Sequence, residues 1–272
     1  MYKIGTYNTD ITPKGSVDLN GYILRFGKST GVHDPLTANF FYLESEEKKL
    51  LLISLDILTI SFETYKFLRD AISKVTNIEK DSIIIAAIHT HAAIGAPYLR
   101  NVGIEPEDWL EEFKDEIIEG SIIASMNTVE CELYSYEAYS AVGINRRNQY
   151  RGNDPNAPFI VAENENGIIA MLINYNCHPV CLTESNLMIS ADYIHFLRNY
   201  IHNELEKNFP ILFFNGGSGD IDPRHRGSFE EAQITGEQLA KELLLTYQTY
   251  KGNKINSIIK CNTINMTIPY SW

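Results

Sequence analysis

Short apolar runs alternate along the chain with segments whose apolar residues recur at helical spacing. The runs predict strands in the first part of residues 3–25 and at residues 37–44, 48–56, 83–91, 131–139, 159–179 (a hairpin), 209–214 and 256–270. The helical spacing predicts helices at residues 61–75, 105–125, 192–207 and 229–248. Strands and helices that alternate in this way indicate an α/β protein.

The run at 48–56 is almost unbrokenly apolar, which is typical of a strand buried on both faces. Ser228 and Glu231 have the spacing of a capping box and predict the start of the last helix. No internal repeat or linker divides the sequence. We therefore expect one domain, residues 1–272, with a mixed β-sheet flanked by helices and a site at the carboxyl ends of the strands.

Composition excludes several classes of protein. The chain carries 35 acidic against 23 basic residues, a net charge of -12, and such a charge disfavours a nucleic-acid partner. No run of about 18 apolar residues indicates a membrane span, and the N-terminus lacks the layout of a signal peptide, so we expect a cytoplasmic protein. The four cysteines show no CxxC spacing and are expected to be buried thiols.

The tripeptide His-Thr-His at residues 89–91 is the first candidate for chemistry. Residues two apart on a strand point to the same side, so His89 and His91 are expected to present both imidazoles to one point. Neighbouring imidazoles are typical of a metal site. Two structural histidines satisfied by hydrogen bonds are the alternative.

Polar groups also follow other predicted strands. Four strands end in side chains that can do chemistry: Asp56, the pair His89 and His91, His178, and the loop from Asn215 to Asp222. Ligands of open α/β sheets bind beyond the carboxyl ends of the strands, so these groups are expected to converge. An imidazole-rich set favours zinc. A coincidence of strand ends is the alternative.

Further histidines have simpler explanations. His195 and His202 lie seven apart on one predicted helix and are expected to be half-buried helix residues, and His225 is expected to be solvated. His33 lies in a loop, where a functional role and a turn role are both open. We count His33 and Asn215 as candidate substrate-binding residues.

Eight short motifs occur in an order that resembles a known family. They are DITP, GVHDP, LD, HTH, INR, NCHP, SAD and GSGDIDP, spread over residues 5–225. Together they resemble the N-terminal catalytic domain of the neutral/alkaline non-lysosomal ceramidases, which are zinc amidases. The resemblance implies that His89 and His178 are zinc ligands, that His91 contacts the substrate carbonyl or water, and that Arg146 is a polar residue of the site.

The sequence departs from the ceramidase pattern at two points. Asp222 stands where the family has a critical serine, and the family's other zinc ligands, a glutamate and a tyrosine, come from a region beyond Trp272. We therefore expect this chain to lack the downstream part of the family.

A carboxylate beside a metal can act as general base toward water, whereas Asp222 capping backbone amides is the alternative. The sequence offers no basic amphipathic helix for a lipid surface. We therefore expect a ceramidase-like, zinc-dependent hydrolase of an amide (N-acyl) bond, whose substrate is a small-molecule or lipid amide and need not be ceramide. A non-catalytic binding protein or pseudoenzyme is the competing hypothesis.

Overall fold

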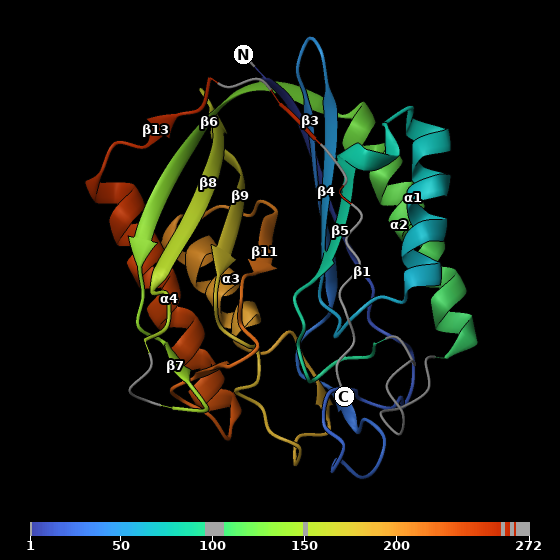
Figure 1. The fold of residues 1–272 in the computed structure, drawn as a ribbon, viewed down its shortest axis with the longest axis vertical. Helices are drawn as coiled ribbons and strands as arrows, with labels where there is room; N and C mark the ends of the chain where they lie inside the picture. The colour runs from blue at the N-terminus through green and yellow to red at the C-terminus, as the bar shows by residue number, and fades with distance from the viewer. Residues whose placement is uncertain (1, 96–105, 149–151, 257–258, 262–263, 265–272) are drawn as a thin grey trace.

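The computed structural model describes residues 2–95, 106–148, 152–256, 259–261 and 264 (Figure 1). The longer strands are β1 (Tyr2–Asp10), β3 (Thr37–Glu44), β4 (Lys49–Leu55), β5 (Ile83–Ala87), β6 (Thr128–Tyr139), β8 (Asn156–Asn164), β9 (Gly167–Tyr175) and β11 (Ile211–Asn215). Shorter ones are β2 (Gly31–Val32), β7 (Gly143–Asn145), β10 (Met188–Ile189), β12 (Ile221–Pro223) and β13 (Asn253–Lys254). The α-helices are α1 (Phe62–Thr76), α2 (Glu107–Met126), α3 (Tyr193–Glu204) and α4 (Phe229–Thr249), and η1 (Lys80–Ser82) is a 3₁₀ turn.

Within the described residues, nine strands form one mixed sheet. Its order is β11-β9-β8-β6-β1-β3-β4-β5, with β13 paired to β6. The pairs β4–β5 and β9–β11 are parallel and the other pairs of this path are antiparallel. We call β1, β3, β4 and β5 the N-terminal half-sheet, and β6, β8, β9 and β11 the C-terminal half-sheet. The predicted α/β class with a mixed sheet is confirmed.

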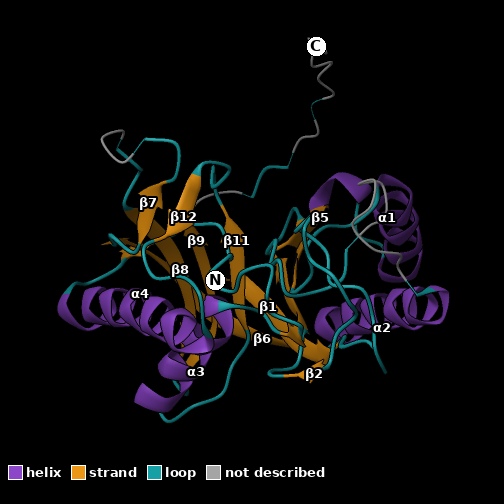
Figure 2. Cartoon of the chain, turned by 90° about the horizontal axis from the view of Figure 1, so that it is seen from below, coloured by secondary structure: helices purple, strands orange, loops and turns teal. Residues whose placement is uncertain are grey.

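The two half-sheets face each other, and helices cover both outer faces. Figures 1 and 2 show α1 and α2 outside the N-terminal half-sheet and α3 and α4 outside the C-terminal one. The inner faces meet in one apolar cluster that takes residues from both halves, among them Phe41, Leu43, Leu133, Leu172 and Leu212. The strands β3 and β4 therefore bury both faces, which explains why their sequences are apolar at successive positions rather than at alternate ones.

The helices begin and pack as their sequences predict. The Ser61 side chain caps α1 by accepting a hydrogen bond from the Thr64 amide, and Leu68 and Ile72 are fully buried. The Ser228 side chain accepts from the Glu231 amide at the start of α4. Each cap satisfies an amide that has no partner within its helix. None of the described helices is long and apolar enough to cross a membrane.

A seam joins β4 of the N-terminal half-sheet to β11, the edge strand of the C-terminal half-sheet. The Ser54 hydroxyl donates to the Phe213 carbonyl at 2.7 Å, and the Phe213 amide donates back to Ser54 Oγ at 3.3 Å. The strands β4, β5, β9 and β11 end on the same side of the molecule, at the lower end in Figure 1. The loops that follow these strands are therefore close together.

The prediction that His89 and His91 lie on a strand was wrong. The strand β5 ends at Ala87, so His89 and His91 lie in the following loop, and His89 has a left-handed backbone with φ 69°. Alternation on a strand is therefore not what brings their imidazoles together. The strand predicted at residues 256–270 falls largely outside the described residues, and the described positions of that range are not in a strand. Cys131, Cys177 and Cys181 are buried thiols, as expected, and Cys261 is partly exposed.

Candidate metal centre

Three histidines meet beyond the ends of β5 and β9. One potential ligand atom from each of His89, His91 and His178 lies within 4.8 Å of the other two. Their ring centroids are 4.8 to 5.2 Å apart, and the Nε2 atoms of His91 and His178 are 3.0 Å apart. The N-terminal half-sheet supplies two of these side chains and the C-terminal half-sheet supplies the third.

The imidazole of His89 is fixed by the chain that follows β4. Its Nδ1 donates to the Leu58 carbonyl at 2.7 Å, and its amide donates to the Ile57 carbonyl at 3.1 Å. With the proton on Nδ1, the lone pair lies on Nε2, which is thereby left as the ligand atom of His89. This arrangement, in which a carbonyl orients a metal-ligating histidine, is common at metal sites.

His91 is positioned by contacts on two sides. The Tyr22 ring packs edge-on against the imidazole, with centroids 4.8 Å apart. On Gly21, which has φ +101°, a Cβ atom would lie 2.4 Å from the ring, so only glycine fits there. Thr90, between the two histidines, donates its hydroxyl to the Ser190 carbonyl at 3.0 Å. The HTH loop is thus pinned to the segment before α3.

The loop that carries His178 is held by a buried aspartate. The His178 amide donates to the Ile221 carbonyl at 2.9 Å. Asp192, fully buried at the start of α3, accepts backbone hydrogen bonds from Cys181, Leu182 and Tyr193 at 2.7 to 3.2 Å. Burial raises the pKa of Asp192, and these amides oppose the rise. The NCHP and SAD motifs therefore form one unit.

All three imidazoles are neutral near pH 7. Burial lowers the pKa of His91 to about 2, reinforced by repulsion from His178 and His89 in their protonated forms. Burial, with the charges of His89 and Arg146, lowers the pKa of His178 to about 4. Burial also lowers the pKa of His89. Neutral imidazole is the form that binds metal ions, and the buried Nδ1 of His91 has no hydrogen-bond partner among the described residues. These side chains fit a divalent transition metal.

Arg146 and Asp222 lie beside the histidines. The Arg146 Nη2 donates to the Gly219 carbonyl at 2.7 Å, and its Nη1 is 3.7 Å from Asp222 Oδ1. The Asp222 Oδ2 accepts from Arg226 at 2.6 Å, while Oδ1 is buried and makes no hydrogen bond with the described residues. Guanidinium groups therefore hold this carboxylate, and the described residues provide no backbone amide for it to cap.

Asn215 has a different contact from the one expected of a substrate-binding residue. Its side-chain amide donates to the carbonyl of Ile88, the residue before His89. Its Oδ1 is buried without a hydrogen-bond partner in the described part of the chain. Asn215 therefore joins the end of β11 to the loop that carries the first histidines.

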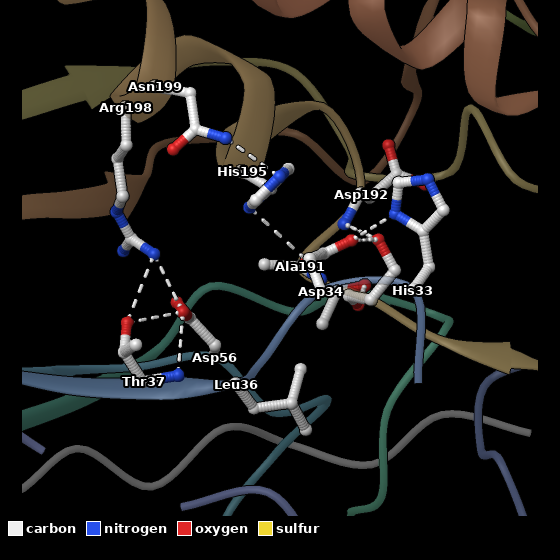
Figure 3. Close-up of polar contacts among 12 residues, drawn as sticks. His33, Asp34, Leu36, Thr37, Asp56, Ala191, Asp192, His195, Arg198 and Asn199 are labelled. Atoms are coloured by element: carbon white, nitrogen blue, oxygen red, sulfur yellow. Dashed lines mark hydrogen bonds and ion pairs between the residues drawn. The ribbon is translucent and has the colours of Figure 1, made fainter. Parts of the chain in front are cut away.

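His33 belongs to a separate polar cluster (Figure 3). Its Nδ1 contacts Asp34 Oδ2 at 2.8 Å, and its ring stacks on Phe229 with centroids 3.7 Å apart. Asp34 also accepts from the Ser190 hydroxyl at 2.6 Å and from the Ala191 amide at 2.8 Å. The GVHDP motif thus supports the segment to which Thr90 is pinned, and His33 is not among the residues grouped around the candidate metal position.

Asp56 does not join the three histidines, contrary to the expected convergence of four strand ends. Figure 3 shows its carboxylate facing Arg198 of α3. Its Oδ2 accepts from Arg198 Nη1 at 2.6 Å and from both the amide and the hydroxyl of Thr37. The two residues after Asp56 do reach the site. The Ile57 and Leu58 carbonyls accept hydrogen bonds from the amide and the Nδ1 of His89.

The remaining histidines lie outside the group of three, and His195 Nδ1 is 3.6 Å from Asp34 Oδ1 in the cluster of Figure 3. His195 and His202 are half-buried on α3, as expected, and bind Asn199 at 2.8 Å and the Phe209 carbonyl at 2.8 Å. His225, which was expected to be solvated, has a side chain that is 43% exposed, and its Nδ1 lies 3.0 Å from a Glu231 carboxylate oxygen.

Comparison with solved structures identifies the architecture. The crystal structure of neutral ceramidase from Pseudomonas aeruginosa superposes with a TM-score of 0.81 at 19% identity, covering 91% of this chain and 45% of that one. A ceramidase complexed with C2 gives a TM-score of 0.80 at 17% identity, covering 91% of this chain and 44% of that one. This chain has the ceramidase fold.

The chain spans about half the length of these two ceramidase structures. No family model and no curated protein matches the sequence. At such low identity the likeness to the ceramidases is one of fold, and the chemistry has to be argued from the residues of this chain.

Sequence reasoning missed the residues that hold the histidines in place. Tyr22 contacts His91 across 69 positions, and Arg25 donates to the His91 carbonyl at 2.6 Å. Nothing in the periodicity of residues 20–28 indicates this contact. The glycines at both ends of that segment were the only available signal of a constrained loop.

Proposed function

We propose that the chain is a ceramidase-like catalytic domain that hydrolyses an amide (N-acyl) bond with the help of a zinc ion held by His89 and His178. One observation carries the proposal: three neutral imidazoles meet at the strand ends of a ceramidase fold. A bound zinc ion supplies Lewis acidity and a nucleophile at neutral pH. His91, the third imidazole, contacts the substrate carbonyl or the attacking water.

Arg146 and Asp222 suit two events in amide hydrolysis: the carbonyl oxygen becomes negatively charged, and the attacking water loses a proton. Water adds to the amide carbonyl carbon, the carbonyl oxygen becomes an oxyanion, and the C–N bond then breaks as the amine takes a proton. Arg146 is partly exposed, so its guanidinium can reach that oxyanion. Asp222 Oδ1, which makes no hydrogen bond with the described residues, is the acceptor for the proton that water loses. That His33 and Asn215 bind the substrate stays a prediction.

A non-catalytic binding protein is the second candidate, and one contact favours it. Arg226 occupies Asp222 Oδ2 at 2.6 Å, which stabilises the carboxylate and makes it a weaker base. The two candidates share the metal and differ in turnover.

Metal analysis of the purified protein, followed by a screen of N-acyl amides with short and long acyl chains, separates these functions. The proposal expects about one zinc per chain and release of free acid from at least one amide. Zinc without turnover on any amide would favour the binding protein. A protein that takes up no divalent metal would refute both.

A further inference from the structure

A second polar cavity lies beside α3. One of its walls comes from β1, β3 and the residue Pro35, and the other comes from α3 and the residues at the start of β11. Figure 3 shows part of both walls, with His195, Arg198 and Asn199 on α3 and Thr37 on β3. The described residues that line this cavity include none of the three histidines of the candidate metal centre. We call it the α3 cavity.

Arg198 is the only permanently charged side chain among the described residues that line the α3 cavity. Its side chain is 10% exposed. Its Nε donates to the Ile211 carbonyl at 3.1 Å, and its Nη1 donates to Asp56 Oδ2 at 2.6 Å and to Thr37 Oγ1 at 3.3 Å. Its Nη2 has no hydrogen-bond partner among the described residues. Buried polar atoms nearly always have a partner, so the two N–H groups of Nη2 indicate a ligand position.

No acidic side chain faces the α3 cavity among the described residues that line it. Asp56 lies outside the lining and spends its Oδ2 on Arg198 Nη1 and on Thr37, while its Oδ1 is buried without a partner in the described part of the chain. His195 and His202 belong to the lining, and burial lowers the pKa of both, so they are neutral near pH 7. The α3 cavity is therefore lined by one cation, neutral polar groups and no anion.

The size and the apolar lining of the α3 cavity limit what it can hold. Its volume is about 160 Å³, roughly ten times the room that one water molecule needs and below the range of about 300–1,000 Å³ that is typical of sites for drug-sized ligands. Pro35, Phe209 and Ile211 supply apolar surface, and the exposed Asn8 and Asn199 lie where the cavity opens. A guanidinium beside apolar side chains suits a carboxylate on a short hydrocarbon tail.

We propose that the α3 cavity binds a small organic carboxylate. Its anionic group accepts hydrogen bonds from Arg198 Nη2, and its hydrocarbon tail lies against Phe209 and Ile211. An inorganic oxyanion shares the charge and leaves the apolar surface unused, whereas a neutral amide shares the shape and leaves the cation unused. The proposal does not depend on hydrolysis at the candidate metal centre.

Isothermal titration calorimetry with sodium butyrate tests the ligand class. We expect one butyrate to bind per chain, at least about tenfold weaker binding of butyramide, which lacks the charge, and no displacement by equimolar phosphate. Affinity should rise from acetate to butyrate and fall at octanoate, because the cavity has room only for a short tail. Absence of saturable butyrate binding, equal binding of butyramide, displacement by phosphate, or affinity that still rises at octanoate would each overturn the proposal.

Two variants test the position of the ligand. D56N/R198M removes the cation together with its counter-charge, so no unpaired charge is left in the core, and it should abolish butyrate binding. Asn8→Asp places an acid at the exposed opening and should weaken butyrate binding about threefold or more. The matched control Asn203→Asp makes the same change at an exposed position of α3 that does not line the cavity, and its affinity should equal that of the wild type.

Circular dichroism establishes whether each variant is folded, and Asn8→Asp keeps the test decisive if D56N/R198M is not. Unchanged affinity in the folded variants would refute the site. His178→Ala alters the candidate metal centre and should bind butyrate as the wild type does. Loss of butyrate binding in His178→Ala would place the carboxylate at the metal centre and overturn the proposal.

Discussion

The buried ion pair between Arg198 and Asp56 offers the sharpest test of the fold. Asp56 is fully buried, and its only described partners are Arg198 and Thr37. Replacing Arg198 by methionine keeps an apolar side chain of similar length and removes the cation. It also frees the Ile211 carbonyl, which accepts from Arg198 Nε at 3.1 Å.

The expected loss of stability is large because the charge that remains cannot reach water. Removing one partner of a buried ion pair lowers the free energy of unfolding by about 3–5 kcal/mol. In a domain of this size each 1 kcal/mol lowers Tm by roughly 2 °C, so Arg198→Met should unfold about 6–10 °C below the wild type. Removing the remaining charge as well, in D56N/R198M, should restore about half of the lost stability or more.

Urea denaturation followed by circular dichroism measures these differences, and a thermal scan checks them. The matched control is Lys14→Met, which removes the cation of the exposed Lys14–Glu112 pair and should change stability by less than about 1 kcal/mol. The reasoning fails if Arg198→Met costs no more than Lys14→Met. It also fails if D56N/R198M is less stable than Arg198→Met alone.

Three further predictions concern the candidate site. His89→Ala should abolish zinc binding if its fixed imidazole is a ligand, as proposed, whereas His195→Ala, on a helix face, should leave zinc stoichiometry unchanged; equal loss in both would show that the wrong histidines are assigned. Asp222→Asn should keep the metal and lower kcat by roughly 10²- to 10⁴-fold, and an unchanged rate on an accepted amide would remove Asp222 from the mechanism. The metal-free protein should lose stability as pH falls from about 6.5 to 4, because the unfolded state takes up a proton on His178 that the folded state, with a pKa of about 4, does not. Urea titrations should show a smaller pH dependence for His178→Gln, and an equal slope would contradict the burial of that imidazole.

Local pattern was enough to predict the class of fold and most elements. The apolar runs at 37–44 and 48–56 became β3 and β4 because a buried strand needs apolar residues on both faces and little else. The meeting of His89 with His178 was predicted because sites of open α/β sheets form beyond the carboxyl ends of the strands. That rule applies whatever chain lies between the two strands.

Features that depend on contacts between distant residues were not accessible from pattern. Asp56 pairs with Arg198 across 142 positions, and no periodicity links them. The left-handed backbone of His89 is a consequence of the loop around it, since hydrophobic periodicity carries no information about φ. The exposure of Ile23, Leu24 and Phe26 was also missed, because a short apolar run predicts burial by default.

An ion bound by the three histidines would link the two half-sheets beside their seam. His89 and His91 follow β5 of one half-sheet and His178 follows β9 of the other, while Ser54 hydrogen-bonds to Phe213 and Asn215 to Ile88 across the same boundary. An ion bound there acts as a cross-link, and at a thousandfold excess over its Kd it stabilises the folded state by about 4 kcal/mol. By linkage, the factor by which a bound ion favours the closed seam equals the factor by which opening the seam lowers the affinity for the ion. Loss of the ion and opening of the seam are therefore thermodynamically coupled, and each is expected to promote the other.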